Sequence, residues 1–325
     1  MSVQLLLDRP AGLGHGRHMD WISRKLTLPP PLAPFIEERL VAAGWTSLSS
    51  ERATGDRRVT LRVYVRPGEA LPAPEDFAGW IAEAETAGLP GARLRFEDDE
   101  FDEQDWNAAF REHFVPREVI PGLTVVPPWN MTGPVHQRGE PMPGSNADLS
   151  LVIEPALAFG TGDHPTTQMC LEMLRDYARE REASGKPWDC LDIGSGTGIL
   201  SIAAKLWGAR RVEGFDIDKR SILNAYLNAD LNGLAGDVRF RWGEPKDLGE
   251  KQWDIVVCNL FLTPIQKYLS QMAKAADPNG ILVLSGFLDE QQEKVTDLAC
   301  MKNLKLTITK QKDHWVSQLW VKTSN

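Results

Sequence analysis

The chain has 325 residues, of which 42% are hydrophobic and 25% are charged, and its formal net charge is −9. Its length and composition predict a globular protein of two domains with enough apolar residues for a core in each. The negative charge argues against direct binding of nucleic acid and favours a basic protein partner. No apolar run is long enough to cross a membrane, so no membrane association is expected.

The cysteines and histidines show no metal-binding pattern, because no C-x-x-C pair is present and the histidines do not cluster with cysteines. Widely spaced cysteines favour free thiols in a reducing, cytoplasmic compartment and argue against a structural metal site. The four cysteines are Cys170, Cys190, Cys258 and Cys300.

The first 98 residues are predicted to hold a leader and a small domain. Residues 1–19 contain several glycines and are expected to be a disordered leader. Residues 20–98 alternate between strand-like and helix-like patterns in the order βαββαβ, which predicts a ferredoxin-like α+β domain. The expected segments are 21–28, 31–43, 45–50, 57–66, 77–87 and 92–97.

An acidic segment follows this domain. Seven of the nine residues from 97 to 105 are acidic, which predicts a solvated linker or the start of a helix, with a collar that attracts a basic substrate as the alternative. Residues 99–122 are therefore expected to be an acidic linker and helix. One face of that helix would carry Trp106, Phe110 and Phe114.

Residues 123–325 are predicted to form an α/β domain. Two strands, 123–126 and 149–153, precede a region in which helices and strands alternate, as in a doubly wound and mostly parallel sheet. The last two strands are close together in sequence and are expected to be antiparallel. The seven strands of the sheet are expected at 188–193, 211–216, 237–242, 253–258, 279–285, 303–309 and 314–322.

The most informative motif is a glycine-rich turn that follows the first of these seven strands. Residues 192–198 read Asp-Ile-Gly-Ser-Gly-Thr-Gly, and Asp216 ends the next strand. Glycines at 194, 196 and 198 let the backbone turn tightly and approach a ligand, while Asp216 can accept hydrogen bonds from ribose hydroxyls. The glycine spacing differs from the dinucleotide fingerprint. It resembles the first motif of class I methyltransferases, which bind S-adenosylmethionine, and Gly194 and Gly196 are expected to contact this cofactor.

A nicotinamide site, or a glycine turn with no ligand, is the alternative interpretation of that motif.

A second motif lies upstream, at residues 159–167, Phe-Gly-Thr-Gly-Asp-His-Pro-Thr-Thr. Asp163 is a good N-cap and Pro165 suits the first turn of a helix. The first turn of the helix would gather the hydroxyls of Thr166 and Thr167 with His164 and Phe159, and Phe159 and Thr167 are expected to bind the cofactor. A well-capped surface helix is the alternative, and His164 is expected to be structural rather than a catalytic base.

A third candidate is Asn259, which follows an apolar strand, residues 254–258. Open α/β sheets bind their ligands at the carboxyl ends of such strands. The amide oxygen of Asn259 can accept a hydrogen bond from an amine, whereas an asparagine that merely turns the chain is the alternative.

Together these motifs resemble the bacterial ribosomal protein L-eleven (L11) methyltransferase family. The most specific element is residues 158–167, and the resemblance extends from Asp105 to the His314–Lys322 segment. It implies a class I methyltransferase domain and a substrate-recognition domain at residues 20–98. It also implies cofactor binding by Thr167, Gly194, Asp216 and Asn259, with Asn259 orienting the acceptor amine.

The loop after Asn259 departs from the family pattern, because Phe261 and Leu262 are bulkier than the usual residues. The expected activity is S-adenosylmethionine-dependent N-methylation of lysine or the N-terminal α-amine of a basic large-subunit ribosomal protein. No metal and no catalytic triad are expected. The alternatives are a lysine methyltransferase of another protein, a nicotinamide oxidoreductase and a non-enzymatic ribosome-binding module.

Overall fold

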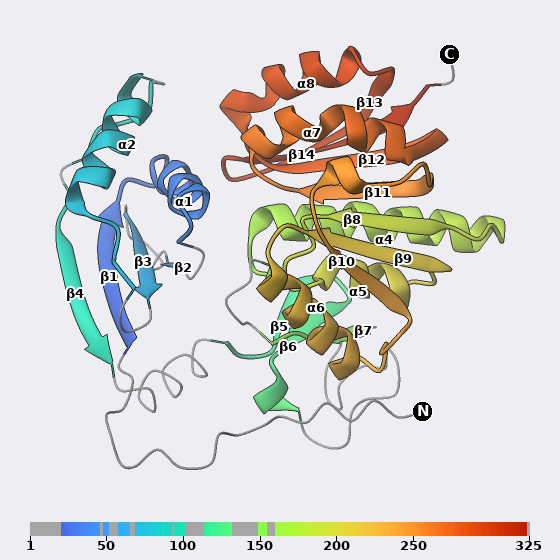
Figure 1. Ribbon diagram of the computed structural model, residues 1–325, viewed down its shortest axis with the longest axis horizontal. Helices are drawn as coiled ribbons and strands as arrows, with labels where there is room; N and C mark the ends of the chain where they lie inside the picture. The colour runs from blue at the N-terminus through green and yellow to red at the C-terminus, as the bar shows by residue number, and fades with distance from the viewer. Residues whose placement is uncertain are drawn as a thin grey trace.

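The computed structural model describes residues 21–45, 48–51, 58–65, 69–86, 88–92, 94–101, 114–131, 149–154 and 160–323. These residues form a small α+β unit at the N-terminal side and a larger α/β unit that contains the C-terminus (Figure 1). Within this described part, no helix is long and apolar enough to cross a membrane.

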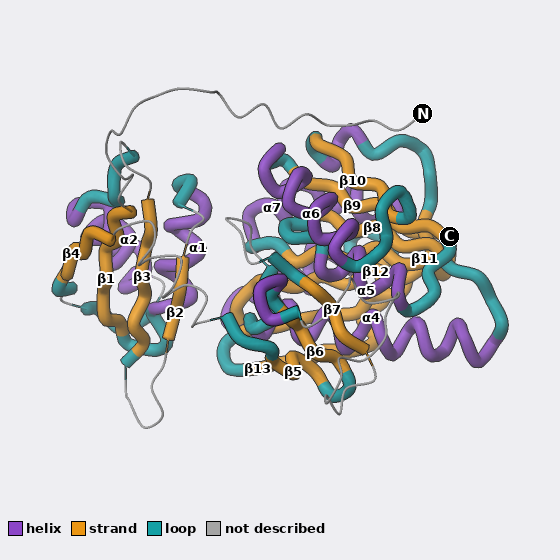
Figure 2. The backbone as a smooth tube through the Cα atoms, turned by 90° about the horizontal axis from the view of Figure 1, so that it is seen from below, coloured by secondary structure: helices purple, strands orange, loops and turns teal. Residues whose placement is uncertain are grey.

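The small unit has the expected ferredoxin-like order. Its sheet runs β2-β3-β1-β4 with all neighbours antiparallel. Apolar side chains of β1 and β3 pack against the two helices, with Leu26, Leu61, Ile36 and Phe77 fully buried. The elements are β1 (Trp21–Leu28), α1 (Ala33–Ala42), β2 (Leu48–Glu51), β3 (Val59–Val65), α2 (Pro74–Thr86) and β4 (Phe96–Phe101), and Figure 2 shows them from below.

Strand β4 differs from the prediction, because it starts at Phe96 rather than Ala92 and includes the start of the acidic segment. Its acids are paired across the sheet: Arg24 Nε donates to Asp98 Oδ1 at 2.7 Å, and Lys25 Nζ donates to Glu97 Oε2 at 3.0 Å. Opposite charges on facing residues stabilise a strand pair, and charges on an edge strand oppose further pairing. This part of the segment is therefore a strand and not a linker.

The rest of the segment expected to be linker and helix is only partly described. Residues 102–113 lie outside the described residues, and the leader at 1–19 lies outside them too. Residues at 117–120 form a strand that was not predicted. A three-stranded sheet results, in the order β5-β6-β7, from β5 (Arg117–Ile120), β6 (Leu123–Val126) and β7 (Leu149–Val152), with η1 (Pro128–Asn130) after β6.

The large sheet has seven strands in the order β10-β9-β8-β11-β12-β14-β13. All neighbours are parallel except β14, which is antiparallel to β12 and β13. Every predicted strand of this sheet is present. The strands are β8 (Asp189–Ile193), β9 (Arg211–Asp216), β10 (Val238–Trp242), β11 (Trp253–Asn259), β12 (Ala276–Leu288), β13 (Leu304–Lys312) and β14 (Trp315–Lys322).

Helices cover both faces of this sheet. Alternate residues of β11 enter opposite cores: Ile255 and Val257 pack with α4, α5 and α6, whereas Val256 and Cys258 pack with α7 and α8. This arrangement explains why β11 reads as a continuous apolar run. The helices are α4 (Pro165–Ser184), α5 (Ile199–Leu206), α6 (Lys219–Leu231), α7 (Leu262–Ala275) and α8 (Gln292–Cys300), with short turns η2 (Pro245–Asp247) and η3 (Asp289–Gln291).

The strand order reverses direction at β8, since the chain adds β9 and β10 on one side and β11 and β12 on the other. Ligands of open α/β sheets bind at such a switch point, outside the carboxyl ends of the strands. Gly194 follows the carboxyl end of β8, and Asp216 and Asn259 are the last residues of β9 and β11. The fold therefore brings the three sequence motifs to one edge of the sheet.

Candidate active site

The glycine turn after β8 is fixed to β9 by backbone hydrogen bonds. Gly194 has a φ of +80°, and its N–H donates to Phe215 O at 2.7 Å, while Ser195 N–H donates to the same oxygen at 3.0 Å. Gly198 then ends the turn as the N-cap of α5. The left-handed backbone at Gly194 strains any residue with a side chain, which explains the glycine there.

Asp216 is held by the same turn. Gly196 N–H donates to Asp216 Oδ2 at 2.9 Å and Asp218 N–H donates to Asp216 Oδ1 at 2.9 Å. Each carboxylate oxygen keeps a further lone pair for a ligand donor. Burial raises the pKa of Asp216, and the backbone donors oppose this shift. A desolvated, fixed carboxylate of this kind suits a neutral diol such as a ribose.

Asn259 and Thr167 meet at the end of β11. Asn259 Nδ2 donates to Thr167 Oγ1 at 3.3 Å, and Thr167 is 1% exposed at the start of α4. Asn259 Oδ1 is buried and accepts no hydrogen bond from any of the described residues. An unsatisfied buried acceptor costs about 1–3 kcal/mol, so this oxygen fits a ligand that brings an N–H donor.

The N-terminus of α4 is capped differently from the prediction. The N-cap is His164, whose Nδ1 accepts from Thr166 N–H at 3.3 Å, with Pro165 at the first helical position. Asp163 instead pairs with Arg117 at 3.0 Å. Because proline favours the first turn, the residue before it becomes the cap. The expectation of a structural role for His164 agrees with this cap, since burial lowers its pKa to about 4.

The low pKa of His164 predicts an acid-sensitive fold. Between pH 6.5 and 4 the unfolded chain protonates this histidine while the folded protein does not, so the free energy of unfolding falls as pH falls, by on the order of 2–3 kcal/mol. The replacement His164→Asn keeps a capping oxygen but does not titrate. In urea unfolding measured from pH 7 to pH 4, the free energy of unfolding of the wild type should fall relative to that of this variant.

Comparison with the variant matters here because Asp192 titrates in the same range with the opposite sign. Burial raises the pKa of Asp192 to about 7, so its contribution to stability is lost as pH rises. The contribution of Asp192 is the same in the wild type and in the variant, so it cancels when their free energies of unfolding are subtracted. Parallel stability profiles for the two proteins would contradict the prediction for His164.

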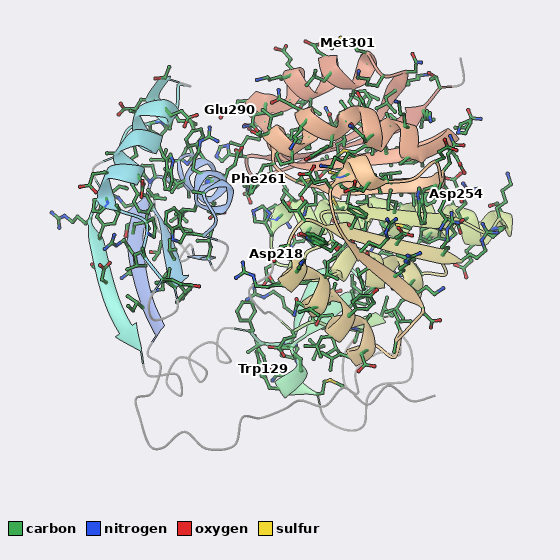
Figure 3. All side chains as sticks on the ribbon, viewed as in Figure 1. Trp129, Asp218, Asp254, Phe261, Glu290 and Met301 are labelled. Atoms are coloured by element: carbon green, nitrogen blue, oxygen red, sulfur yellow. The ribbon has the colours of Figure 1, made fainter. Side chains whose placement is uncertain are left out.

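Four apolar residues, two of them from the segments that carry Thr167 and Asn259, form a small cluster, named the apolar wall below. It consists of Met169 from α4, Phe261 from the loop after β11, Leu288 from β12 and Trp315 from β14. The Trp315 ring also contacts His164 edge-on, with centroids 4.7 Å apart. Figure 3 shows Phe261 on the side of the large unit that faces the small unit, with Asp254 at the other end of β11. Phe261 is the partly buried member of this cluster, and it follows Asn259 by two residues.

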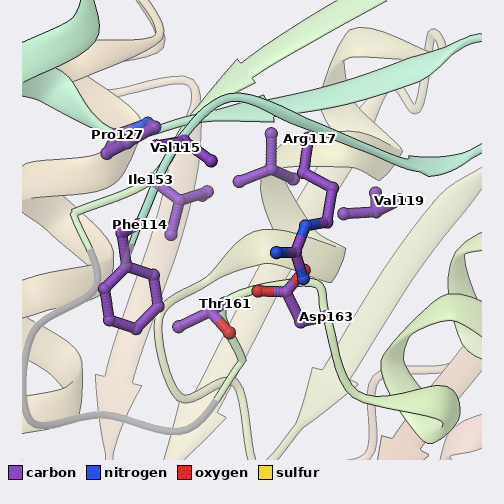
Figure 4. A pocket seen from close by; sticks show the side chains of 9 residues that line it. Phe114, Val115, Arg117, Val119, Pro127, Ile153, Thr161 and Asp163 are labelled. Carbon is purple, nitrogen blue, oxygen red and sulfur yellow. The ribbon is translucent and has the colours of Figure 1, made fainter. Parts of the chain in front are cut away.

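A pocket lies between β5, β6 and the 160–163 loop (Figure 4). Its lining includes the pair of Arg117 and Asp163, which point toward one another. Of the predicted site residues that the structure describes, none lines it. The lining residues are Phe114, Val115, Arg117, Val119, Val125, Pro127, Ile153, Thr161 and Asp163.

The structure thus brings five of the six predicted site residues to one edge of the sheet: Thr167, Gly194, Gly196, Asp216 and Asn259. The sixth, Phe159, lies outside the described residues. Leu260 was missed by the sequence reasoning. Its side chain fills the space beside Gly194, where an added Cβ would lie 2.5 Å from Leu260 Cδ2. An apolar residue after an asparagine forms no sequence pattern that would indicate its role.

The strand order, the glycine turn after β8 and the acid at the end of β9 define a class I methyltransferase, the class whose methyl donor is S-adenosylmethionine. The chain belongs to the ribosomal protein L11 methyltransferase family. The family described as "Ribosomal protein L11 methyltransferase (PrmA)" matches residues 42–323, which include most of the small unit and the whole large sheet.

Individual relatives agree with this assignment. The ribosomal protein L11 methyltransferase of Pseudomonas aeruginosa (strain LESB58) is 32% identical over 92% of this chain and 97% of its own length. That of Bacillus licheniformis is 29% identical over 67% of this chain, and the match spans 65% of the relative. The crystal structure of a ribosomal protein L11 methylase from Lactobacillus delbrueckii subsp. bulgaricus has a TM-score of 0.54 and 25% identity, over 65% of this chain and all of that one.

Proposed function

We propose that this protein transfers methyl groups from S-adenosylmethionine to amines of ribosomal protein L11, the substrate that the names of its relatives give. The observation that carries the proposal is Oδ1 of Asn259, which is buried and has no hydrogen-bond partner among the described residues. It lies beside Thr167 at the edge of the sheet that also carries the glycine turn. The sulfonium of the cofactor supplies an activated methyl group, and the protein supplies position and exclusion of water.

Residues of β8 and β9 would hold the cofactor. Asp216 would accept hydrogen bonds from the ribose hydroxyls, and the Gly194–Gly196 turn would face the rest of the molecule. Ile217, which is 69% exposed next to Asp216, would give the adenine an apolar surface. A role in ligand binding would explain why an isoleucine this exposed lies at the end of the strand that carries Asp216.

Asn259 would orient the lone pair of the acceptor amine by accepting one of its N–H groups. The amine must first be neutral, which at pH 7 costs about 1 kcal/mol for an α-amine and about 4–5 kcal/mol for a lysine. The apolar wall at Phe261 and Trp315 lowers the amine pKa by desolvation, because burial disfavours the charged form. No dedicated base is then required.

We also propose the division of labour that the sequence suggested, in which residues 20–98 recognise the ribosomal protein and residues 123–325 carry the chemistry. The net charge of −9 supports a basic protein partner rather than nucleic acid. A ribosomal substrate and free cysteines are consistent with a cytoplasmic reaction.

Replacing Asp216 with alanine should weaken S-adenosylmethionine binding about tenfold to hundredfold, because hydrogen bonds to a charged acceptor contribute about 1.5–3 kcal/mol. Calorimetry with the purified protein measures this change. The matched control is Asp218→Ala, which removes a side-chain cap of α6 but leaves the backbone N–H that serves Asp216. Its dissociation constant should stay within threefold of the wild type. Binding of NADH without binding of S-adenosylmethionine would refute the cofactor assignment.

A further inference from the structure

Leu260, the residue after Asn259, lies between two glycines, Gly194 in the turn after β8 and Gly286 in β12. An alanine Cβ at Gly194 would lie 2.5 Å from Leu260 Cδ2, and an alanine Cβ at Gly286 would lie 2.5 Å from Leu260 O. Both distances are too short for real atoms. The side chain of Leu260 therefore fits only because Gly194 has no Cβ, and its backbone fits only because Gly286 has no Cβ.

The close contact at Gly286 lies at a bulge in strand β12. Asn259 is in register with Ser285, and Leu260 N–H donates to Ser285 O at 2.9 Å. The pairing of β12 with β14 shifts register between Ser285 and Phe287, and Gly286 has a φ of +94°. Bulges next to active sites end strand pairing and redirect neighbouring side chains. Here the bulge makes room for the backbone that leaves β11.

We propose that Leu260 is a positioning residue, which fixes the direction of the Asn259 amide by fitting between the glycine turn of β8 and the bulge of β12. The proposal rests on the proposed function of Asn259 as the group that orients the acceptor amine. Leu260 itself contacts neither reacting group. It determines where the backbone leaves β11, and this sets the side chains on both sides of it, Asn259 and Phe261.

Loss of Leu260 should affect the acceptor side and not the cofactor side. The glycine turn is held by its two hydrogen bonds to Phe215 O, and Asp216 is held by Gly196 and Asp218. None of these bonds involves Leu260. Asn259, by contrast, has one side-chain hydrogen bond among the described residues, at 3.3 Å to Thr167, which alone leaves the amide free to tilt.

The test is a double-mutant cycle between Asn259→Ala and Leu260→Ala, read as the single-turnover rate of methyl transfer to L11 at saturating cofactor. Leu260→Ala should lower this rate at least tenfold with a cofactor dissociation constant within threefold of the wild type. In the Asn259→Ala background it should lower the rate by less than threefold, because its effect passes through Asn259. Leu260→Met, which conserves volume, should restore the rate to within threefold.

Leu269→Ala on α7 is the matched control, since it removes a leucine that is 2% exposed and is not among the nearest neighbours of Gly194 or Gly286. Its effect on the rate should be equal in both backgrounds. Gly286→Ala is a second variant, and its loss of rate should also disappear in the Asn259→Ala background. Equal effects of Leu260→Ala with and without Asn259 would overturn the positioning role alone. An unchanged rate for Asn259→Ala itself would overturn both the proposed function of Asn259 and this inference.

Discussion

Replacing Asn259 with alanine will lower the turnover number about tenfold to hundredfold, while the dissociation constant of S-adenosylmethionine stays within about threefold. The proposed contact of Asn259 Oδ1 is with the acceptor amine, and loss of one buried hydrogen bond of this kind costs about 1.4–2.7 kcal/mol in the transition state. Steady-state kinetics on L11 and calorimetry with the cofactor measure the two quantities separately.

Thr167→Val is the matched variant for this prediction. Valine keeps the shape of threonine but removes the hydroxyl that accepts from Asn259 Nδ2. The amide of Asn259 is then less restrained, so turnover should fall by a smaller factor than in Asn259→Ala. Unchanged turnover for Asn259→Ala at saturating substrate would show that the unpartnered oxygen has another role.

The sequence predicts the large unit well because the apolar patterns of its strands and of its helices specify it independently. The strands at 188–193 and 253–258 lack polar residues in their centres, as buried parallel strands do, and both are observed with shifts of one residue or less at their bounds. The functional motifs follow the ends of those strands. Once the strand order is known, the meeting of Gly194, Asp216 and Asn259 at one edge is a consequence of parallel topology.

The errors come from interactions between residues distant in sequence. Charge composition alone makes residues 97–101 read as a linker, whereas the cross-strand partners Arg24 and Lys25 make them a strand. The N-cap is His164 because Pro165 takes the first helical position, and Asp163 pairs with the distant Arg117 instead. Leu260 is important only because Gly194 and Gly286 lie on either side of it, and no local pattern reports that contact.

The two units touch at a polar contact between α1 and η3. Glu38 of α1 is 5% exposed, and its carboxylate accepts a hydrogen bond from Gln291. Burial raises the pKa of Glu38, and Arg39 and Gln291 oppose the shift. Gln291 in turn accepts from Leu288 N–H at 3.0 Å, and Leu288 belongs to the apolar wall beside Phe261. Figure 3 shows Glu290 of η3 on the same side of the large unit as Phe261.

This contact places α1 of the small unit beside η3 of the large unit. A chain that starts at Gln104 lacks the small unit but keeps Thr167, Gly194, Asp216 and Asn259. We expect it to bind S-adenosylmethionine within about threefold of the full chain, because the predicted cofactor residues and the hydrogen bonds of Asp216 and Asn259 all lie beyond residue 104. Retained binding also shows that the shortened chain is folded.

Its rate of methyl incorporation into intact L11 should fall at least about a hundredfold, since loss of a recognition surface removes several contacts that each contribute about 2 kcal/mol or more. The rate of methyl incorporation into a short peptide that carries a target amine should fall much less, because the peptide makes few contacts with the small unit. The measurement compares methyl incorporation into L11 and into the peptide by both chains at equal enzyme concentration. If the two chains methylate intact L11 at equal rates, residues 20–98 do not recognise the substrate, and the contact between Glu38 and Gln291 serves stability alone.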